Sequence, residues 1–151
     1  MKPVQVLGLL VIVAVFLAAP ANAGELVNRL ISVCTHDQKP SAELLERYKN
    51  GDFPDDRDSK CVMRCIGLNL GVYDDINGVH MHDTWQMFRQ GRAATEEKAF
   101  ADQHNKCIKQ QTKNVPADDY CGQVYAVFQC YKDEYLALLT NIRKAAAKAQ
   151  G

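Results

Sequence analysis

Six cysteines are the residues of this chain whose type and spacing restrict its chemistry most. Their pattern is Cys34-x26-Cys61-x3-Cys65-x41-Cys107-x13-Cys121-x8-Cys130. Thiolates at such spacings ligate a metal in a reducing compartment and pair as disulfides in an oxidising one. The rest of the sequence must therefore decide between a metal centre and a disulfide framework.

The N-terminus indicates an oxidising compartment. A short positive start, Met1-Lys2, precedes an uncharged run from Pro3 to Gly24, and Ala21-Asn22-Ala23 offers small residues at the positions that a signal peptidase reads. We predict a secretory signal over residues 1–23, with cleavage after Ala23. A transmembrane anchor is the alternative, because the run is nearly long enough to span a bilayer, but no positive cluster follows it. The sequence thus predicts a secreted, extracellular protein with no stable membrane insertion, and with three disulfides instead of a metal.

Residues 24–151 remain after cleavage and are enough for one domain with a modest core. The chain has 18 basic and 18 acidic residues and the leader holds one of the lysines, so the mature net charge is −1. A near-neutral surface argues against nucleic acid as a partner. The sequence contains no Gly-x-Ser-x-Gly, His-Glu-x-x-His or phosphate-binding glycine motif. We therefore expect neither an enzyme nor a cofactor.

Apolar residues recur at helical spacing along most of the mature chain, and we find no convincing strand and no internal repeat. Ser41 is expected to cap the second helix, Asp58 or Ser59 the third, and Thr95 the fifth. The third helix is apolar most of the way round, which indicates a central position. The predicted fold class is all-α, with about six helices. We expect them over residues 25–34, 41–50, 58–70, 81–89, 95–114 and 117–142, followed by a polar tail over residues 143–151.

The spacing also limits which cysteines can pair. Cys61 and Cys65 lie one helical turn apart on one face, so they suit two different partners better than each other. On a continuous helix Cys121 and Cys130 would be separated by about 13.5 Å of rise and about half a turn of rotation, whereas a disulfide needs Cα atoms within about 7 Å. Excluding these two pairs leaves about ten of the 15 ways of pairing six cysteines, and geometry alone goes no further.

Two fixed spacings, x3 between the second and third cysteines and x8 between the fifth and sixth, occur together with Gly51-Asp52-Phe53-Pro54 and with Lys60-Cys61-Val62-Met63-Arg64-Cys65. In these features the sequence resembles the insect odorant-binding proteins, including their pheromone-binding members, from Glu25 to about Leu139. The x41 spacer is long for that family, which indicates an enlarged loop over residues 71–80.

The resemblance implies a compact six-helix fold with the bridges Cys34–Cys65, Cys61–Cys121 and Cys107–Cys130, a pairing that the geometry left open. It also implies reversible binding of small hydrophobic molecules, odorants or pheromones, in an internal apolar cavity. The expected setting is the aqueous lymph of sensilla, with an olfactory receptor as a candidate partner. The alternative is a non-olfactory carrier or interaction protein on the same scaffold, in haemolymph, saliva or seminal fluid. The sequence does not distinguish a monomer from a homodimer.

Apolar residues on the predicted helices are our candidates for the lining of that cavity. Methionine adapts to irregular ligands, and aromatic rings supply contact area at low entropy cost. The alternative is plain core packing, which has the same helical spacing. The candidates are Leu30, Val33, Met63, Ile66, Leu68, Met81, Trp85, Phe88, Val124, Val127 and Phe128.

Two further features concern the release of a ligand. The apolar segment after Cys130 either extends the last helix or covers the cavity as a lid, and its unbroken helical spacing favours an extension. Among His36, His80, His82 and His104, the pair His80 and His82 is the better candidate for a pH-dependent switch. Solvated surface histidines are the simpler interpretation of all four.

Three short motifs resemble functional sites of other protein classes. Cys34-Thr35-His36-Asp37 is similar to the His-Asp pair of secreted phospholipases, but the tandem cysteines and calcium loop of those enzymes are missing. Asp75-Ile76-Asn77-Gly78 resembles part of an EF-hand loop. The first and last ligand positions of such a loop would fall on Tyr73 and Thr84, which have no carboxylate, so we predict a turn. His80-x-His82-Asp83 lacks a fourth metal ligand at suitable spacing.

Overall fold

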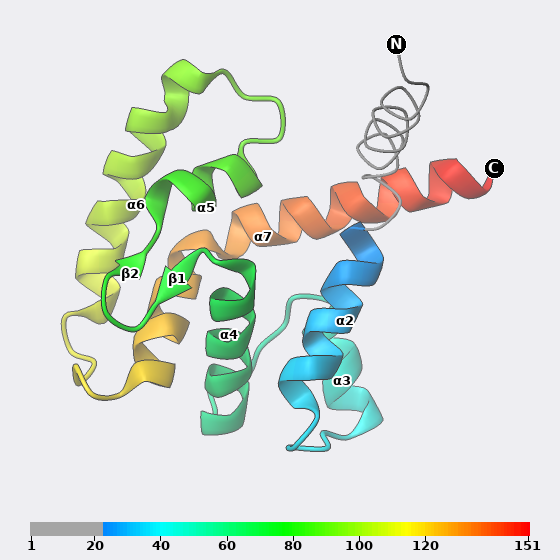
Figure 1. The fold of residues 1–151 in the computed structure, drawn as a ribbon, viewed down its shortest axis with the longest axis horizontal. Coiled ribbons are helices and arrows are strands. Elements are labelled where there is room, and N and C mark those ends of the chain that lie inside the picture. Colours follow the sequence, from blue (N-terminus) through cyan, green and yellow to red (C-terminus); the bar gives the residue numbers. More distant parts are fainter. Residues whose placement is uncertain (1–22) are drawn as a thin grey trace, which may run out of the picture.

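Six α-helices, one short 3₁₀ helix and a two-stranded hairpin make up the computed structural model, which describes residues 23–151 (Figure 1). The signal predicted over residues 1–23 lies outside these residues apart from Ala23. The all-α fold class is confirmed. The elements in chain order are α2 (Ala23–Thr35), α3 (Ala42–Lys49), α4 (Arg57–Leu70), β1 (Tyr73–Asp74), β2 (Gly78–Val79), α5 (Met81–Phe88), η1 (Ala94–Glu96), α6 (Glu97–Thr112) and α7 (Tyr120–Gln150).

Side-chain caps determine where α3 and α4 begin. Ser41 caps α3 as predicted, because its hydroxyl accepts a hydrogen bond from the Leu44 amide at 3.1 Å. The prediction of Asp58 or Ser59 as the cap of α4 is wrong, since Asp56 occupies that position. Its carboxylate accepts from the Ser59 amide at 2.8 Å and from the Ser59 hydroxyl at 2.9 Å. A carboxylate at this end of a helix also complements the positive end of the helix dipole.

The middle of the chain departs from the sequence prediction in two places. Thr95 lies inside η1, which leads directly into α6, so it does not cap the fifth helix. Residues 71–80, expected to be irregular, contain β1 and β2, which pair antiparallel with Tyr73 opposite Val79. Gly78, with φ of 76°, allows the turn between them. Strands of two residues are too short to show an alternating pattern, so sequence periodicity cannot detect them.

The last helix is longer than predicted. Asp119 caps it by accepting a hydrogen bond from the Gly122 amide at 2.9 Å, and the helix then runs unbroken for 31 residues. The expected polar tail over residues 143–151 is helical as far as Gln150. Its alanines, lysines and glutamine are all strong helix formers, so the helix continues past the last apolar turn.

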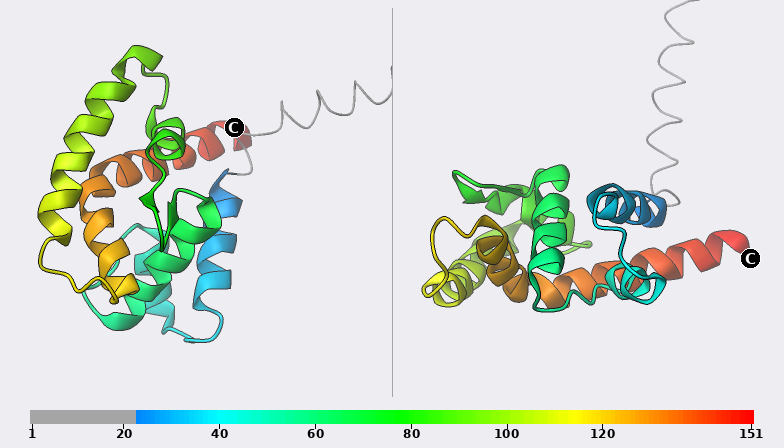
Figure 2. Two further views of the ribbon diagram at one scale, coloured as in Figure 1. Left: turned by 60° about the vertical axis from the view of Figure 1, so that its left-hand side comes forward. Right: turned by 90° about the horizontal axis from the view of Figure 1, so that it is seen from below.

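α4 lies at the centre of the fold, with α2 and α3 on one side and the hairpin and α6 on the other (Figure 1). α7 packs along these elements and bends, so that its C-terminal arm runs in a different direction from its first turns (Figure 2). The side chains of Val62 and Ile66 on α4 are buried against those of Val124, Phe128 and other residues of α7. This central packing confirms the position predicted for the third helix.

Three disulfides connect α4 and α7 to the rest of the fold. Their Cα–Cα distances are 5.6 Å for Cys34–Cys65, 4.7 Å for Cys61–Cys121 and 5.9 Å for Cys107–Cys130. The pairing is the one implied by the resemblance. Cys61 and Cys65 bridge to different helices, as expected for residues on one face of a helix, so α4 is bonded to both α2 and α7.

Candidate functional site

An apolar cavity of about 70 Å³, here called the inner cavity, lies between α4, the hairpin, α5 and α7. No charged side chain lines it. The hydroxyl of Thr84, one of its few polar groups, donates to the His80 carbonyl at 2.9 Å and is therefore already satisfied. Its lining residues are Met63, Ile66, Gly67, Leu70, Val72, Tyr73, Val79, Thr84, Met87, Phe88, Val124, Val127, Phe128, Tyr131 and Tyr135.

A second apolar cavity of about 250 Å³, the outer cavity, adjoins the first and is enclosed by α2, α4, α5 and α7. The two cavities share four lining residues, namely Ile66, Leu70, Met87 and Tyr135. The remaining residues of the outer cavity are Leu26, Val27, Leu30, Ile31, Leu138 and Ile142. Since the shared side chains form the boundary between the two spaces, small movements of flexible ones such as Met87 would join them.

The wall supplied by α4 follows from helical spacing. Met63, Ile66, Gly67 and Leu70 lie at i, i+3, i+4 and i+7 and therefore share one face. A Cβ atom at Gly67 would lie 3.4 Å from the Cβ of Tyr73, so the absence of a side chain leaves room where the hairpin approaches the helix. The cysteines that bridge α4 to its neighbours hold this face in position.

Aromatic rings form the wall supplied by α7. Phe128 packs edge-to-face on Phe53 and on Tyr135, with ring centroids 5.6 Å apart in both pairs. Tyr131 stacks on Phe88 at 5.7 Å, and its hydroxyl donates to the Met81 sulfur at 3.5 Å. Burial raises the pKa of Tyr131 well above its usual range and that of Tyr135 to about 12, so both phenols are neutral.

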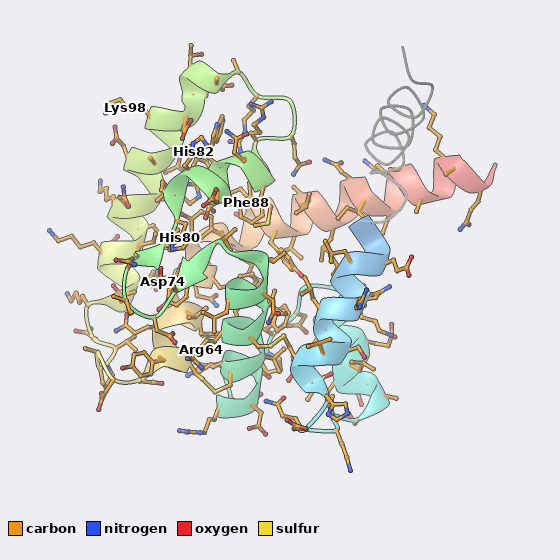
Figure 3. The ribbon with its side chains drawn as sticks, in the orientation of Figure 1. Arg64, Asp74, His80, His82, Phe88 and Lys98 are labelled. Atoms are coloured by element: carbon orange, nitrogen blue, oxygen red, sulfur yellow. A yellow bond between two sulfur atoms is a disulfide. The ribbon has the colours of Figure 1, made fainter. Side chains whose placement is uncertain are left out.

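A charged contact closes the hairpin at the rim of the inner cavity, where Figure 3 shows Asp74 and His80 close together. His80 Nδ1 lies 2.9 Å from the Gly71 carbonyl and Nε2 lies 2.5 Å from the Asp74 carboxylate. The carbonyl and the ionised carboxylate are both acceptors, so this arrangement favours the protonated imidazole, which donates from both ring nitrogens. The Asp74 carboxylate first, and then the Gly71 carbonyl, raise the pKa of His80. The Asp74 pKa is strongly lowered by donors from Asn77, His80 and Ile76.

The other histidines differ in exposure. His36 and His82 are exposed, as predicted, and His82 lies 2.7 Å from Glu97, which raises its pKa. His104 is only 2 % exposed, so the interpretation of all four as solvated is wrong. Its Nδ1 lies 2.8 Å from the Phe100 carbonyl and its Nε2 lies 3.0 Å from Glu134.

The structure places most of the candidate lining residues at the two cavities. Ile66 lines both of them. Leu30 lies at the outer cavity. Those at the inner cavity are Met63, Phe88, Val124, Val127 and Phe128.

Four candidates do not line either cavity. Val33 and Leu68 are 58 % and 37 % exposed, because they lie on the outer faces of α2 and α4. Trp85 is fully buried in the core, where its ring packs on Phe100 with centroids 5.2 Å apart. Met81 contacts the Tyr131 hydroxyl from outside the cavity. Trp85 and Met81 thus belong to the core, the alternative interpretation of their spacing, whereas the exposed positions of Val33 and Leu68 were foreseen by neither interpretation.

Several lining residues were not among the candidates. Val79 lies in β2 and Val72 directly precedes β1, a region without a detectable sequence pattern. Tyr135, Leu138 and Ile142 lie at i, i+3 and i+7 on the arm of α7 beyond Cys130. That spacing is visible in the sequence, where it favours an extension of the last helix over a lid; in the structure the extended arm also lines the outer cavity.

Residues 23–151 also bear on metal binding and on membrane insertion. In this part of the chain, no group of three or more His, Cys, Asp or Glu side chains is arranged to hold a metal ion. Over the same residues, no helix combines the length and the apolar character needed to cross a bilayer.

An all-α domain in which three disulfides surround an apolar space has the construction of a small-molecule carrier. The sequence profile of the PBP/GOBP family matches residues 19–134, and the chain belongs to this family. The family consists of odorant-binding carriers and not of enzymes. Its members are typically secreted proteins.

Individual relatives support the assignment. The chain is 24 % identical to odorant-binding protein 22 of Aedes aegypti over 142 residues, which cover 89 % of this chain and 98 % of that protein. It is 27 % identical to general odorant-binding protein 99b of Drosophila melanogaster over 109 residues, or 72 % of this chain and 71 % of the relative.

A solved structure of odorant-binding protein 22a from Anopheles gambiae, with bound odorant cyclohexanone, is 30 % identical, with a TM-score of 0.63. The similarity covers 78 % of this chain and 98 % of that one. A second structure of the same mosquito protein, in the open status for ligand binding, gives 31 % identity and a TM-score of 0.61, over 73 % of this chain and 92 % of that one.

Proposed function

We propose that this protein is a secreted carrier that binds small hydrophobic molecules reversibly in the joined inner and outer cavities and delivers them to sensory receptors. The observation that carries the proposal is the continuous apolar lining of two adjoining cavities inside a disulfide-braced domain. A secretory signal over residues 1–23 and a location in sensillar lymph belong to the same proposal.

The size and lining of the cavities suit such ligands. A dry cavity of about 150 Å³ lined by Leu, Ile and Phe is enough to bind benzene. The outer cavity, at about 250 Å³, is larger than that. With no charged side chain in either wall, selection depends on shape and apolar contact. The relative that was solved with cyclohexanone supports small, weakly polar molecules as ligands.

Displacement of the fluorescent probe N-phenyl-1-naphthylamine tests the binding. Leu70 lines both cavities, whereas Leu68 on the same helix is exposed. We expect Leu70→Trp to weaken probe binding about tenfold or more, because the larger ring fills the boundary between the cavities. Leu68→Trp makes the same change at the surface and should leave the affinity unchanged.

Cyclohexanone and linear alcohols and esters should displace the probe from the wild-type protein. Unchanged probe affinity in Leu70→Trp, with native circular dichroism, would place binding outside these cavities. Delivery needs a separate measurement, the localisation of the protein by antibody. Absence from olfactory sensilla would overturn delivery to olfactory receptors and leave carriage intact.

A further inference from the structure

The wall of the outer cavity contains one side-chain oxygen. Of the ten side chains around this cavity, nine are leucine, isoleucine, valine or methionine, and the tenth is Tyr135. Tyr135 also lines the inner cavity and therefore belongs to the boundary between the two spaces. A ligand that extends through both cavities would have to pass this side chain.

The Tyr135 hydroxyl has no hydrogen-bond partner among residues 23–151, whereas the Tyr131 hydroxyl donates to the Met81 sulfur at 3.5 Å. Over the same residues, Trp85 Nε1 is the one polar side-chain atom that is both fully enclosed and unpaired. The Tyr135 hydroxyl is thus unpaired without being fully enclosed, although the residue as a whole is only 7 % exposed. The open space beside it is that of the cavities it lines.

Water is a poor partner for this hydroxyl. A buried water molecule typically makes about three hydrogen bonds, and cavities without enough polar groups stay dry. Apart from Tyr135, the side chains of the outer cavity contain no nitrogen or oxygen. In the inner cavity, the Thr84 hydroxyl already donates to the His80 carbonyl. The Tyr135 donor is therefore left for a molecule that brings its own acceptor and fills the apolar space around it.

We propose that the Tyr135 hydroxyl donates a hydrogen bond to the carbonyl oxygen of an uncharged ligand, a ketone, aldehyde or ester, bound across the two cavities. The inference rests on the proposed carrier function and specifies its ligand class. Burial raises the pKa of Tyr135 to about 12, so the phenol keeps its proton and can donate at physiological pH. A carbonyl only accepts and so matches this donor. An alcohol would leave its own O–H without a side-chain acceptor in the outer wall.

The unequal sizes of the cavities indicate where the carbonyl lies along a linear ligand. The inner cavity measures about 70 Å³ and the outer cavity about 250 Å³. A carbonyl at their boundary therefore has a short group on the inner side and a longer chain on the outer side, as in a methyl ketone. The hydrogen bond adds one directed contact to apolar complementarity, which is the usual composition of a small-molecule site.

Two ligands that differ only at the carbonyl isolate this hydrogen bond. 2-Undecanone and 2-methyl-1-undecene have the same chain, with C=CH₂ in place of C=O in the alkene, which keeps the shape and loses the acceptor. Each is used to displace N-phenyl-1-naphthylamine from the wild type and from three variants, Tyr135→Phe, Tyr73→Phe and Tyr125→Phe. We expect Tyr135→Phe, which removes only the oxygen, to weaken 2-undecanone about three- to tenfold, the range of one net hydrogen bond. The affinity for the alkene should not change.

The other two variants are the controls. Tyr125 also lies on α7 but lines neither cavity, and its hydroxyl donates to the Phe53 carbonyl at 2.9 Å. Tyr125→Phe therefore measures the general effect of losing a phenol oxygen from this helix and should leave the ratio of ketone to alkene affinity unchanged. Tyr73 lines only the inner cavity, and its hydroxyl is also unpaired among residues 23–151. Tyr73→Phe should leave the same ratio unchanged.

Equal losses of ketone and alkene in Tyr135→Phe would assign the oxygen a structural role and overturn the inference. A selective loss of the ketone in Tyr73→Phe or Tyr125→Phe that equals the loss in Tyr135→Phe would overturn it as well. If both ligands displace the probe and 2-undecanone is insensitive to Tyr135→Phe, the inference fails and the carrier function stands. If neither displaces the probe from the wild type, the carrier function itself fails.

Discussion

The inner and outer cavities share four residues, but their walls are restrained differently. Of the α7 residues of the inner wall, Val124, Val127 and Phe128 lie between Cys121 and Cys130, both of which are in disulfides, Tyr131 directly follows Cys130, and Tyr135 is shared with the outer wall. The α7 residues of the outer wall, Tyr135 to Ile142, lie beyond the last bridge. On α2, the residues of the outer wall all precede Cys34. On this side, the outer cavity is thus bounded by two helical arms with no disulfide of their own, held by packing and, for α7, by hydrogen bonds from Arg143 to the Lys49 carbonyl and the Asn50 side chain.

This difference in restraint indicates that the two cavities have different roles in ligand binding. An unfilled apolar space lowers stability, because the side chains around it lose contacts. Bridges on both sides of the inner wall offset that cost and keep its shape constant. The outer wall can separate by small movements of α2 against α7, so it suits entry, exit and ligands of different length. We expect variants of the inner wall to change selectivity and variants of the outer wall to change exchange rates.

Removal of a bridge should have the largest effect. Cys61–Cys121 closes a segment of 60 residues and Cys107–Cys130 one of 23. On the chain-entropy relation, the first is worth about 4 kcal/mol of unfolding free energy and the second about 3. The double variant Cys61→Ala/Cys121→Ala should therefore lose more stability in urea than Cys107→Ala/Cys130→Ala, and both should bind the probe more weakly. Losses below about 1 kcal/mol would contradict bracing of the inner wall by its bridges.

Shortening a side chain of the outer wall should have a smaller effect on stability and a distinct effect on kinetics. Leu138 is partly buried and lines the outer cavity. Leu138→Ala should lower the unfolding free energy by about 1–2 kcal/mol, less than for a fully buried leucine. It should also speed dissociation of the probe in stopped-flow measurements, because the arm of α7 then packs less tightly on α2.

A matched control lies on the same arm. Leu136 is also partly buried, but it packs beside Gly51 and lines neither cavity. Leu136→Ala should cost a similar amount of stability without changing the dissociation rate. Equal acceleration in both variants would mean that general loosening of α7, and not the outer wall, governs release.

Filling the inner cavity should raise stability while it weakens binding. Gly67 lies inside α4, and a Cβ there would be in ordinary contact with Tyr73 and Val124, at 3.4 and 3.9 Å. Gly67→Ala should add about 0.5–1 kcal/mol, because alanine is the better helix former. It should lower probe affinity, since the methyl group occupies cavity space. Gly71→Ala is the control, with the opposite expected effect on stability. The backbone at Gly71 has φ of 71°, which an alanine adopts only with strain, so the unfolding free energy should fall. Gly71 lines neither cavity, so probe affinity should not change. Unchanged affinity in Gly67→Ala would contradict the rigidity of the inner wall.

The sequence predicted the framework better than the cavity, for physical reasons. Helix spacing and capping residues are local signals, so the order of the helices and the Ser41 cap could be anticipated. The disulfide pairing needed the family resemblance, because geometry excludes only pairs such as Cys121–Cys130. Trp85 and Phe88 lie on the same short helix and are both buried, yet only Phe88 lines a cavity. Periodicity identifies an inward face, whereas a void depends on how neighbouring elements meet.

The smallest effect concerns the contact that closes the hairpin beside the inner cavity. Asp74 and the Gly71 carbonyl raise the pKa of His80, and Asp83 lies at 3.9 Å. A group with a raised folded pKa contributes stability that is complete below its unfolded pKa, about 6.5. That contribution is lost as pH rises through the folded value. Asp74, with a lowered pKa, loses its part only in strong acid. The contact therefore holds the hairpin in mild acid and weakens in alkali.

Melting temperatures of the wild type and His80→Gln measure this effect. The stabilisation of the wild type over the variant should be greatest in mild acid and should shrink as the pH rises above neutral. His82 also has a raised pKa, but it pairs with Glu97 on α6, away from the hairpin. His82→Gln therefore serves as the control: it should alter melting without changing probe affinity, whereas His80→Gln should weaken the probe in mild acid as well. If the difference in melting temperature between the wild type and His80→Gln grew with pH instead, the sign would be opposite to the one expected. The charged contact between His80 and Asp74 would then not stabilise the inner wall.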